Sequence, residues 1–236
     1  MRPSIVILTG AGISAESGID TFRDPSGIWS RYRIEDVATP DAFRRDPGRV
    51  HDFYNMRRAK LLADDIRPNA AHEALARLDG GWDGEFLLVT QNIDDLHERA
   101  GSKRLIHMHG EQLKSRCQAC LAVTPLRGDL SVEHVCAACG TKGNLRPHVV
   151  WFGEMPLDMD RITAALSQAD LFVAIGTSGN VYPAADFVSI ATEAGARTVE
   201  LNLEATRGSG LFDKSVQGPA TDIVPRFVGG LLRDGL

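Results

Sequence analysis

The stretch that decides the fold is SIVILTGAGISA, residues 4–15. Its first part, Ser4 to Leu8, is almost entirely apolar, which is typical of a strand buried on both faces of a parallel sheet. The stretch ends in a segment that fits G-x-G-x-x-A, in which glycines allow close backbone approach and a helix N-terminus receives a pyrophosphate. It therefore predicts a dinucleotide-binding α/β fold. Taken alone, the motif also fits a tight strand-to-helix turn with no ligand.

The same apolar pattern recurs along the chain and alternates with helical periodicity. Further strands are expected at 85–90, 149–152, 170–176 and 197–201, with a short one at 104–107. Helices are expected at 47–63, 69–78, 94–100, 156–168, 183–194 and 222–233. Strands that alternate with helices predict a Rossmann-like parallel sheet with helices on both faces.

Two regions break this alternation. Residues 25–80 are helical without a clear strand, and residues 113–145 carry the cysteines, turn residues and little periodicity. We expect these two regions to form a small helical and zinc-binding second domain. The Rossmann-like domain would then consist of residues 1–24, 81–112 and 146–236.

The composition is that of an ordinary globular protein. The 236 residues carry a net charge of −5, which argues against a nucleic-acid partner because phosphate binding needs clustered Lys and Arg. A cationic protein segment fits better. The first apolar run is too short for a signal peptide, and no segment is long enough to span a membrane. We expect a cytoplasmic protein, and nothing in the sequence demands more than a monomer.

The four cysteines form two C-x-x-C pairs. Cys117 and Cys120 are separated from Cys136 and Cys139 by the fifteen residues 121–135. This spacing suits a tetrahedral Zn²⁺ held by four thiolates. A complete shell of four cysteines leaves no position for water, so the zinc would be structural. A redox pair or a degenerate, metal-free site remains the alternative.

The glycine loop lacks the usual companion of a hydride-transfer enzyme. That companion is a second strand ending in an acidic residue about 20 residues further on, which binds a ribose. Residues 31–39 are charged and not strand-like. Polar residues instead follow the late strands, at 176–178 and 202–204. Ligands of open α/β sheets lie at such carboxyl ends. The sequence therefore indicates a dinucleotide site in which the ribose-binding residue comes from elsewhere than the second strand.

With these features in view, the chain resembles the sirtuin (Sir2) family over residues 6 to about 232. The motifs that carry the resemblance are GAGISAESGIDTFRD at 10–24, QNIDDLHERAG at 91–101, HMHG at 107–110, VVWFGE at 149–154, GTSGNVYP at 176–183 and LNLE at 201–204. The paired cysteines fall where this family has its zinc module. The chain is most similar to the bacterial CobB-type members, in the class that includes desuccinylases. It departs from many members at Asp20, where they carry Pro.

The resemblance implies an NAD⁺ site and a peptide site. The cofactor residues would be Gly10, Ala11, Gly12, Ile13, Ser14, Ala15, Glu16, Phe22, Arg23, Trp29, Gln91, Asn92, Ile93, Asp94, Gly176, Thr177, Ser178, Asn202, Leu203, Glu204 and Ala220. Phe22 and Arg23 would lie near the reacting ribose. The peptide would add as a β-strand, between residues Val150, Trp151, Phe152, Gly153 and Glu154 on one side and the loop with Val181 and Tyr182 on the other.

The implied reaction is removal of an acyl group from a protein lysine, with NAD⁺ consumed. The acyl oxygen attacks the ribose C1′ as nicotinamide leaves, and a ribose hydroxyl then attacks the imidate carbon with the help of a base. Histidine suits that role because its usual pKa lies near working pH. Spacing alone does not choose between His107 and His109, but the resemblance selects His109. For Asn92 and Asp94, helix capping is the simpler reading and is compatible with cofactor binding.

The helix at 47–63 bears on the choice of acyl group. Its periodicity places Arg57 in an apolar stripe, where a buried guanidinium needs an anionic partner. That partner is either an acid of this chain or the ligand. Tyr54 and Arg57 match the Tyr-x-x-Arg pair that reads the carboxylate of succinyl- or malonyl-lysine in desuccinylase-class sirtuins. We therefore expect a deacetylase that is also a desuccinylase.

Two other classes of function remain open at this point. An NAD-dependent oxidoreductase is disfavoured because the early acidic ribose-binding residue is missing. A non-catalytic, zinc-stabilised NAD-sensing or docking module is disfavoured by His109 and the QNID segment. ADP-ribosyl transfer shares the cleavage of nicotinamide and is kept as a minor side activity.

Overall fold

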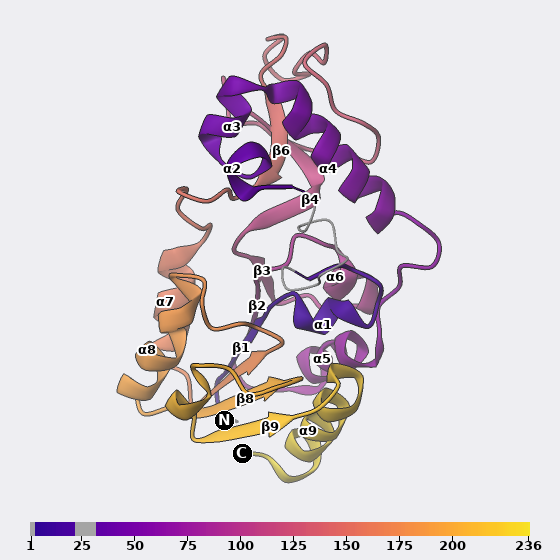
Figure 1. Ribbon diagram of the computed structural model, residues 1–236. Coiled ribbons are helices and arrows are strands. Elements are labelled where there is room, and N and C mark those ends of the chain that lie inside the picture. The colour runs from indigo at the N-terminus through magenta and orange to yellow at the C-terminus, as the bar shows by residue number, and fades with distance from the viewer. Residues whose placement is uncertain (1–2, 22–31) are drawn as a thin grey trace.

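The computed structural model describes residues 3–21 and 32–236, and its centre is a six-stranded parallel sheet. The strand order is β3-β2-β1-β7-β8-β9 (Figure 1). The strands are β1 (Ile5–Thr9), β2 (Phe86–Thr90), β3 (Leu105–His107), β7 (Leu171–Ile175), β8 (Arg197–Asn202) and β9 (Lys214–Gln217). The predicted parallel sheet is confirmed. Strand β9 was not predicted, because Lys214–Gln217 is short and mostly polar.

Helices cover both faces of this sheet, and alternate residues of β1 point to each. Ile5 and Ile7 belong to a core shared with α5 (Ala70–Gly81) and α9 (Ala220–Asp234). Val6 and Leu8 belong to a second core with α7 (Met159–Leu166) and α8 (Phe187–Glu193). The short α1 (Gly12–Ala15) follows β1 directly, and α6 (Leu96–Ala100) contacts α5. Short 3₁₀ turns, η2 (Ala184–Asp186) and η3 (Ser209–Leu211), complete this part.

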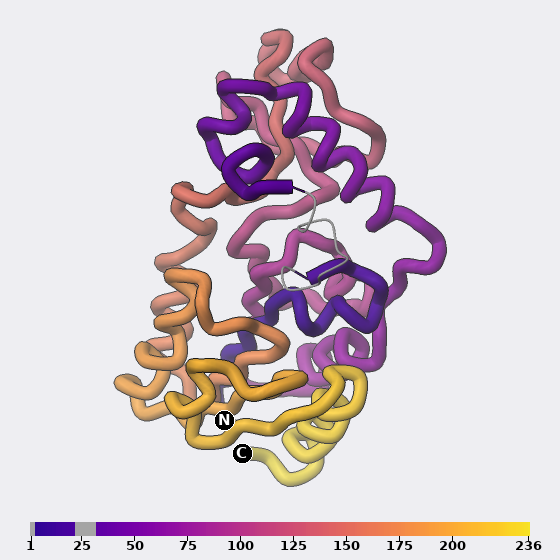
Figure 2. Tube along the Cα trace, in the orientation of Figure 1, coloured from indigo at the N-terminus to yellow at the C-terminus, as the bar shows by residue number. Residues whose placement is uncertain are grey.

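The second part of the molecule lies beyond the carboxyl ends of the strands, at the top of Figures 1 and 2. It contains α2 (Ile34–Val37), α3 (Pro40–Arg45), α4 (Pro47–Leu61) and a three-stranded antiparallel sheet. The sheet has the order β5 (Val123–Pro125), β4 (Gly110–Cys117), β6 (Leu145–Val149). Val50, Phe53, Tyr54, Val149 and Trp151 share one hydrophobic cluster, so α4 packs against the end of this sheet.

Besides β9, two elements differ from the sequence expectations. The run 149–152 is not a strand of the parallel sheet: β6 ends at Val149, and its partner is β4. Helix α5, which we grouped with the small domain, packs on the parallel sheet against α9. Its buried Ala71, Ala74 and Leu75 form an apolar face that shares one core with strands of the large sheet and with α9. Across residues 3–21 and 32–236, no helix has the length and apolar character needed to cross a membrane.

Candidate active site

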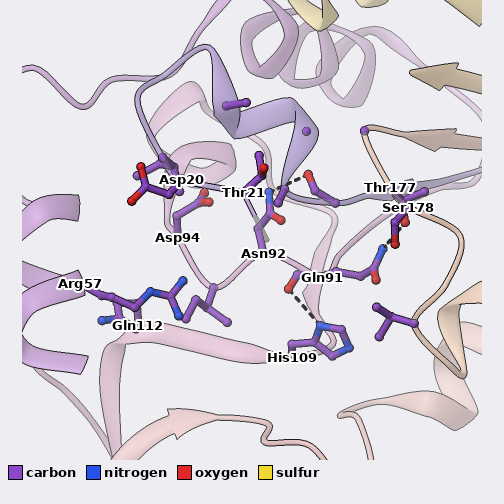
Figure 3. Close-up of a pocket in the computed structure, with 18 of the residues that line it drawn as sticks. Asp20, Thr21, Arg57, Gln91, Asn92, Asp94, His109, Gln112, Thr177 and Ser178 are labelled. Carbon is purple, nitrogen blue, oxygen red and sulfur yellow. Dashed lines mark hydrogen bonds between the residues drawn. The ribbon is translucent and has the colours of Figure 1, made fainter. Parts of the chain in front are cut away.

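A cavity of about 1250 Å³ lies between the two parts of the molecule. Its floor is formed by residues that follow β1, β2, β7 and β8, and its other wall by α4 and the loop after β6. Figure 3 shows polar side chains from both walls turned toward this space. Parallel strands present their carboxyl ends at one edge of a sheet, and ligands of open α/β sheets lie there.

Most of the residues expected from the sequence line this cavity. They are Gly10, Ala11, Gly12, Ala15, Glu16, Tyr54, Arg57, Gln91, Asn92, Ile93, Asp94, His109, Val150, Trp151, Phe152, Gly153, Glu154, Gly176, Thr177, Ser178, Val181, Tyr182, Asn202, Leu203, Glu204 and Ala220. Two do not: Ile13 is fully buried in the core under the sheet, and Ser14 is fully buried beneath the floor. Phe22, Arg23 and Trp29 lie outside the described residues.

The glycines after β1 have a packing role that the motif alone does not reveal. The backbone N–H of Gly12 donates to the carbonyl oxygen of Gly176 at 2.8 Å. A Cβ placed on Gly12 would lie 2.7 Å from the Cα of Gly176, and Gly176 itself has φ +60°. These glycines are therefore required for the two strand-end loops to meet. At this point the cavity is therefore lined by backbone rather than by side chains.

Buried hydrogen bonds fix the side chains of Asn92 and Asp94. The Asn92 Nδ2 donates to Gly10 O and to Ser14 Oγ, each at 3.1 Å, and Ser14 Oγ donates to Asp94 Oδ2 at 3.1 Å. The other Asp94 oxygen accepts from the N–H of Leu96, the first residue of α6, at 3.2 Å. Burial raises the pKa of Asp94. Both residues line the cavity, and neither occupies the N-cap position of α6, which is Asp95.

The two histidines after β2 have different surroundings. Nδ1 of His109 lies 3.1 Å from Gln91 O, and His109 lines the cavity. A carbonyl oxygen only accepts, so Nδ1 carries the proton and the neutral ring keeps Nε2 as a free acceptor. Burial lowers the pKa of His109. His107 is bound instead by Asn92 O and by Glu98, and it is not a lining residue. The geometry thus separates two histidines that their spacing did not.

The α4 wall carries Tyr54 and Arg57, which both line the cavity. The Tyr54 hydroxyl accepts a hydrogen bond from Trp151 Nε1 at 3.0 Å. The Arg57 guanidinium lies 5.7 Å from the ring centre of Phe53 and 5.9 Å from that of Tyr54. Burial lowers the pKa of Arg57, and the carboxylates of Asp94 and Asp20 act in the opposite direction.

Two neighbouring arginines of α4 differ in burial, and Arg57, whose guanidinium packs over Phe53 and Tyr54 of the apolar stripe, is only half-buried. The fully buried arginine is Arg58, with 1% of its surface exposed. Its Nε donates to Gln112 O at 3.1 Å and its Nη1 to Asn55 Oδ1 at 2.9 Å. One residue turns a side chain by about 100° around a helix, so Arg57 is half-buried and faces the cavity.

The loop at 150–154 is held by an internal ion pair. Arg146 donates to both carboxylate oxygens of Glu154, at 2.6 and 2.9 Å, and the Trp151 N–H donates to Glu154 at 2.8 Å. The Arg146 guanidinium also stacks on the Trp151 ring, 3.3 Å from its centre. Although burial opposes it, this pairing lowers the pKa of Glu154. Glu154 thus fixes the shape of the loop, a role that the sequence did not indicate.

Sequence reasoning missed one acidic residue near the cavity. Glu200 on β8 is 3% exposed and accepts hydrogen bonds from the hydroxyls of Thr206, Ser209 and Ser215. These residues follow Asn202 to Glu204, which line the cavity. The cluster of hydroxyl residues at 206–215 was the available signal, since a buried carboxylate needs several donors.

The four cysteines come together at the far end of the second part. Sulfur atoms of Cys117 and Cys139 are 3.8 Å apart, and those of Cys120 and Cys136 are 3.7 Å apart. Four thiolates around Zn²⁺ with bonds of about 2.3 Å have sulfurs about 3.8 Å from one another. The set therefore fits a tetrahedral zinc ion, and these four positions leave no open coordination site.

Comparison with known proteins agrees with this geometry. The Sir2 family domain matches residues 10–183. An NAD-dependent protein deacylase of Caulobacter vibrioides is 56% identical over 97% of this chain and 96% of its own length. An enzyme of the same name from Escherichia coli K12 is 57% identical over 98% of this chain and 83% of its own length. A crystal structure of a Sir2 homologue with NAD superposes with a TM-score of 0.87 at 40% identity, covering 97% of this chain and 90% of the other.

The family match spans most of the chain, and the curated relatives cover nearly all of it. The chain belongs to the Sir2 (sirtuin) family.

Proposed function

We propose that this protein removes acyl groups from protein lysines with consumption of NAD⁺, releasing nicotinamide, O-acyl-ADP-ribose and free lysine. The observation that carries the proposal is the place of His109. Its ring lies in the cavity between the strand ends and the 150–154 loop, with Nδ1 held by Gln91 O at 3.1 Å. The relatives named NAD-dependent protein deacylase support the same reaction.

The floor of the cavity suits a dinucleotide. The glycines at 10, 12 and 176 leave the backbone open for a pyrophosphate. Gln91 Nε2 donates to Thr177 Oγ1 at 3.0 Å, and Asn202 Nδ2 donates to Thr177 O at 2.7 Å. These bonds link the ends of β2, β7 and β8 into one surface. We assign its β2 side to the nicotinamide ribose and its β8 side to the adenosine.

In this proposal His109 is the base. Its Nε2 accepts the proton of a ribose hydroxyl while that oxygen attacks the imidate carbon, and Nδ1 keeps its proton on Gln91 O. The lowered pKa of His109 keeps the ring neutral, which is the form that accepts a proton. Beside it, Asn92 and Asp94 fix the position of the cavity floor through their hydrogen bonds to Gly10 and Ser14. The peptide would lie between 150–154 and 181–182, whose exposed Phe152 and Tyr182 offer apolar contact.

We further propose that Tyr54 and Arg57 extend the substrate range from acetyl to succinyl and malonyl groups. The Tyr54 hydroxyl accepts from Trp151, so its own proton is available to a ligand oxygen. Arg57 is anchored by two aromatic rings and presents its guanidinium to the cavity. A carboxylate pairs well with such a fork. We take Zn²⁺ at the four cysteines to be structural.

The proposal also includes the composition of the second domain, the oligomeric state, the partners and the location of the protein. We infer that the second domain consists of the 25–80 segment, without α5, and the 113–145 module, extended to include all of β4 and β6. We also infer a monomer with acyl-lysine proteins as partners and no nucleic-acid partner. The four-thiolate site favours a cytoplasmic location, because thiols stay reduced there.

A product assay separates the candidate functions. The protein is incubated with NAD⁺ and either an acetyl-lysine or a succinyl-lysine peptide of the same sequence, and products are followed by mass spectrometry. Peptide-dependent nicotinamide and O-acyl-ADP-ribose are expected from both. An oxidoreductase would change absorbance at the nicotinamide without releasing it. A sensing module would bind NAD⁺ and change neither peptide, and that result would overturn the proposal.

A further inference from the structure

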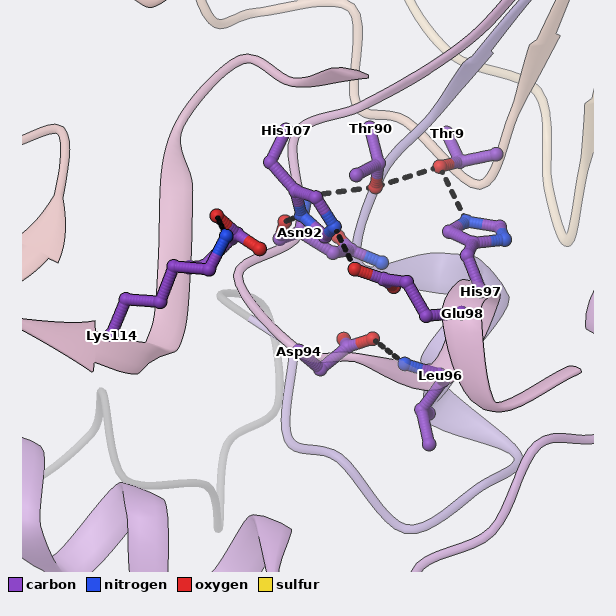
Figure 4. Close-up of polar contacts among 10 residues, drawn as sticks. Thr9, Thr90, Asn92, Asp94, Leu96, His97, Glu98, His107 and Lys114 are labelled. Carbon is purple, nitrogen blue, oxygen red and sulfur yellow. Dashed lines mark hydrogen bonds and ion pairs between the residues drawn. The ribbon is translucent and has the colours of Figure 1, made fainter. Parts of the chain in front are cut away.

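The ring of His107 links helix α6 to the segment that follows β2. Its Nδ1 lies 3.1 Å from Asn92 O, and its Nε2 lies 2.7 Å from Glu98 Oε1. Figure 4 shows both contacts. The His107 side chain is 9% exposed, so its direction is set by packing, whereas that of Glu98 is 40% exposed. His107 does not line the cavity, so any effect on a ligand passes through the residues that it holds.

The ring of His107 carries a proton on both nitrogens. A carbonyl and a carboxylate oxygen only accept hydrogen bonds, so each ring nitrogen donates and the ring is an imidazolium. Burial opposes this charge, but the hydrogen bond to Glu98 and the charge of Glu98 outweigh it and raise the pKa of His107. The charged and titratable groups around the ring come from three segments: Glu98 and His97 of α6, Asp94 before that helix, and Glu111 and Lys114 of β4. Lys114 pairs with Glu111 at 2.5 Å, and burial keeps His97 neutral, so Glu98 is the main charge partner of His107.

Asn92 is the residue through which His107 reaches the cavity. It lines the cavity and is 8% exposed. Its backbone N–H donates to Thr90 Oγ1 at 3.1 Å, and its carbonyl oxygen accepts from His107. Its side-chain Nδ2 donates to Gly10 O and to Ser14 Oγ, each at 3.1 Å. The backbone and the side chain of Asn92 are therefore both fixed, and of these four bonds the one from His107 has a charged donor.

The imidazolium also acts on Asp94, two residues after Asn92. Burial raises the pKa of Asp94, and the charge of His107 works against that change. Asp94 lines the cavity and accepts a hydrogen bond from Ser14 Oγ at 3.1 Å. An ionised carboxylate is a stronger acceptor than a neutral one, so the charge on His107 strengthens this bond. His107 thus supports two lining residues, one by a hydrogen bond and the other by its charge.

We propose that His107, paired with Glu98, is a positioning residue for NAD⁺ that fixes Asn92 and Asp94 on the side of the cavity floor assigned to the nicotinamide ribose. This inference rests on the proposed function, which supplies that assignment. When the ring loses one proton, the remaining proton stays between Nε2 and Glu98, because a bond to a carboxylate is stronger than a bond to a neutral carbonyl. Nδ1 then presents a lone pair to Asn92 O, and the carbonyl is no longer held. This side of the floor should therefore loosen as the pH rises through the pKa of His107.

Glu98→Gln tests the proposal, because it removes the charge of a half-exposed residue and leaves His107 in place. The affinity for NAD⁺, measured by calorimetry on the whole protein, should fall about three- to tenfold, the range of one lost hydrogen bond. The KM for NAD⁺ should rise with it. The KM for an acetyl-lysine peptide should not change, because the peptide is assigned to other segments, 150–154 and 181–182. Glu133→Gln, an exposed acid paired with Lys142 at 2.5 Å on the zinc module, is the matched control and should change neither value.

Two readouts separate positioning from general support of the fold. An NMR titration of the His107 ring should give a midpoint above pH 6.5 in the wild type and a lower midpoint in Glu98→Gln. Above pH 6.5 the NAD⁺ affinity of the wild type should fall as the pH rises, and in His107→Gln this dependence should be absent because the titrating group is gone.

The proposal is overturned if Glu98→Gln binds NAD⁺ as the wild type does, if the KM values for NAD⁺ and peptide rise together, or if the His107 ring titrates at the same pH in both proteins. A wild type that releases no product from either peptide would instead refute the deacylase proposal. The NAD⁺ affinity and the ring titration would still decide the role of His107 in that case.

Discussion

The imidazole of His109 is tied to the backbone of Gln91, with Nδ1 3.1 Å from the carbonyl oxygen. The next carbonyl, that of Asn92, holds His107 at the same distance. Two histidines that are two residues apart therefore rest on two successive carbonyls of the segment after β2. One ring faces the cavity and the other faces Glu98. The two histidines therefore have different surroundings, and only His109 is placed to act on a ligand in the cavity.

His109→Gln should lower kcat by about 10²–10⁴-fold, the usual contribution of a positioned base. Glutamine preserves a hydrogen-bonding side chain but does not take up a proton at working pH. NAD⁺ binding should change little, because the floor glycines and Asn92 are untouched. Single-turnover product formation and calorimetric NAD⁺ binding measure the two effects. Full activity in the variant would remove His109 from the mechanism.

The pH dependence of kcat/KM follows from the surroundings of His109. Burial lowers its pKa from the usual 6.5, so the neutral, proton-accepting form persists to lower pH. The acid limb of the profile should therefore have its midpoint below pH 6.5. A peptide without other titrating groups keeps the limb assignable. A midpoint above 6.5 would show that a different group controls the reaction.

Arg57→Met should depress desuccinylation by at least about tenfold, with desuccinylation falling far more than deacetylation, because a lost charge-assisted pair is worth about 1.5–3 kcal/mol. Methionine keeps an unbranched side chain of similar length but lacks the guanidinium that lies over Phe53 and Tyr54. The ratio of kcat/KM for matched succinyl and acetyl peptides is the measurement. Arg49→Met is a control on the same helix, because that arginine is exposed and pairs with Asp36. Equal losses on both peptides would refute the carboxylate role.

The sequence predicted the parallel sheet well because buried strands such as β1 are short apolar runs bounded by glycine. It failed at 149–152, since an apolar run of four also fits a loop packed beneath Arg146. It did not identify Arg58 as the fully buried arginine of α4, because its partners Gln112 O and Gly128 O are defined only by the fold. Glu200 was missed since its three hydroxyl partners are defined only by the fold.

Removal of zinc should unfold the module rather than stop the chemistry directly. Cys136→Ser leaves three thiolates, and Cys136 is buried beside Leu130 and Leu145, so the loss of the ion also disturbs that small core. We expect less than one equivalent of zinc, a lower melting temperature and reduced activity. Metal analysis and thermal unfolding of the same samples test this. Glu133→Gln, an exposed position of the module whose carboxylate pairs with Lys142, is the control. A zinc-free variant with unchanged stability and activity would refute a structural ion.

Glu200→Gln should raise KM for NAD⁺ several-fold with a smaller change in kcat. The carboxylate accepts from three hydroxyls, whereas an amide has only one oxygen and brings two donors that Thr206, Ser209 and Ser215 satisfy less well. The loop that follows Glu204 would then be held less firmly at the adenosine side. Because His109 lies at the opposite, β2 side, the chemical step should be spared. Glu200→Asp should recover part of the affinity, since it restores the charge with a shorter reach. Equal losses in kcat and in binding would instead mean that Glu200 supports the sheet as a whole.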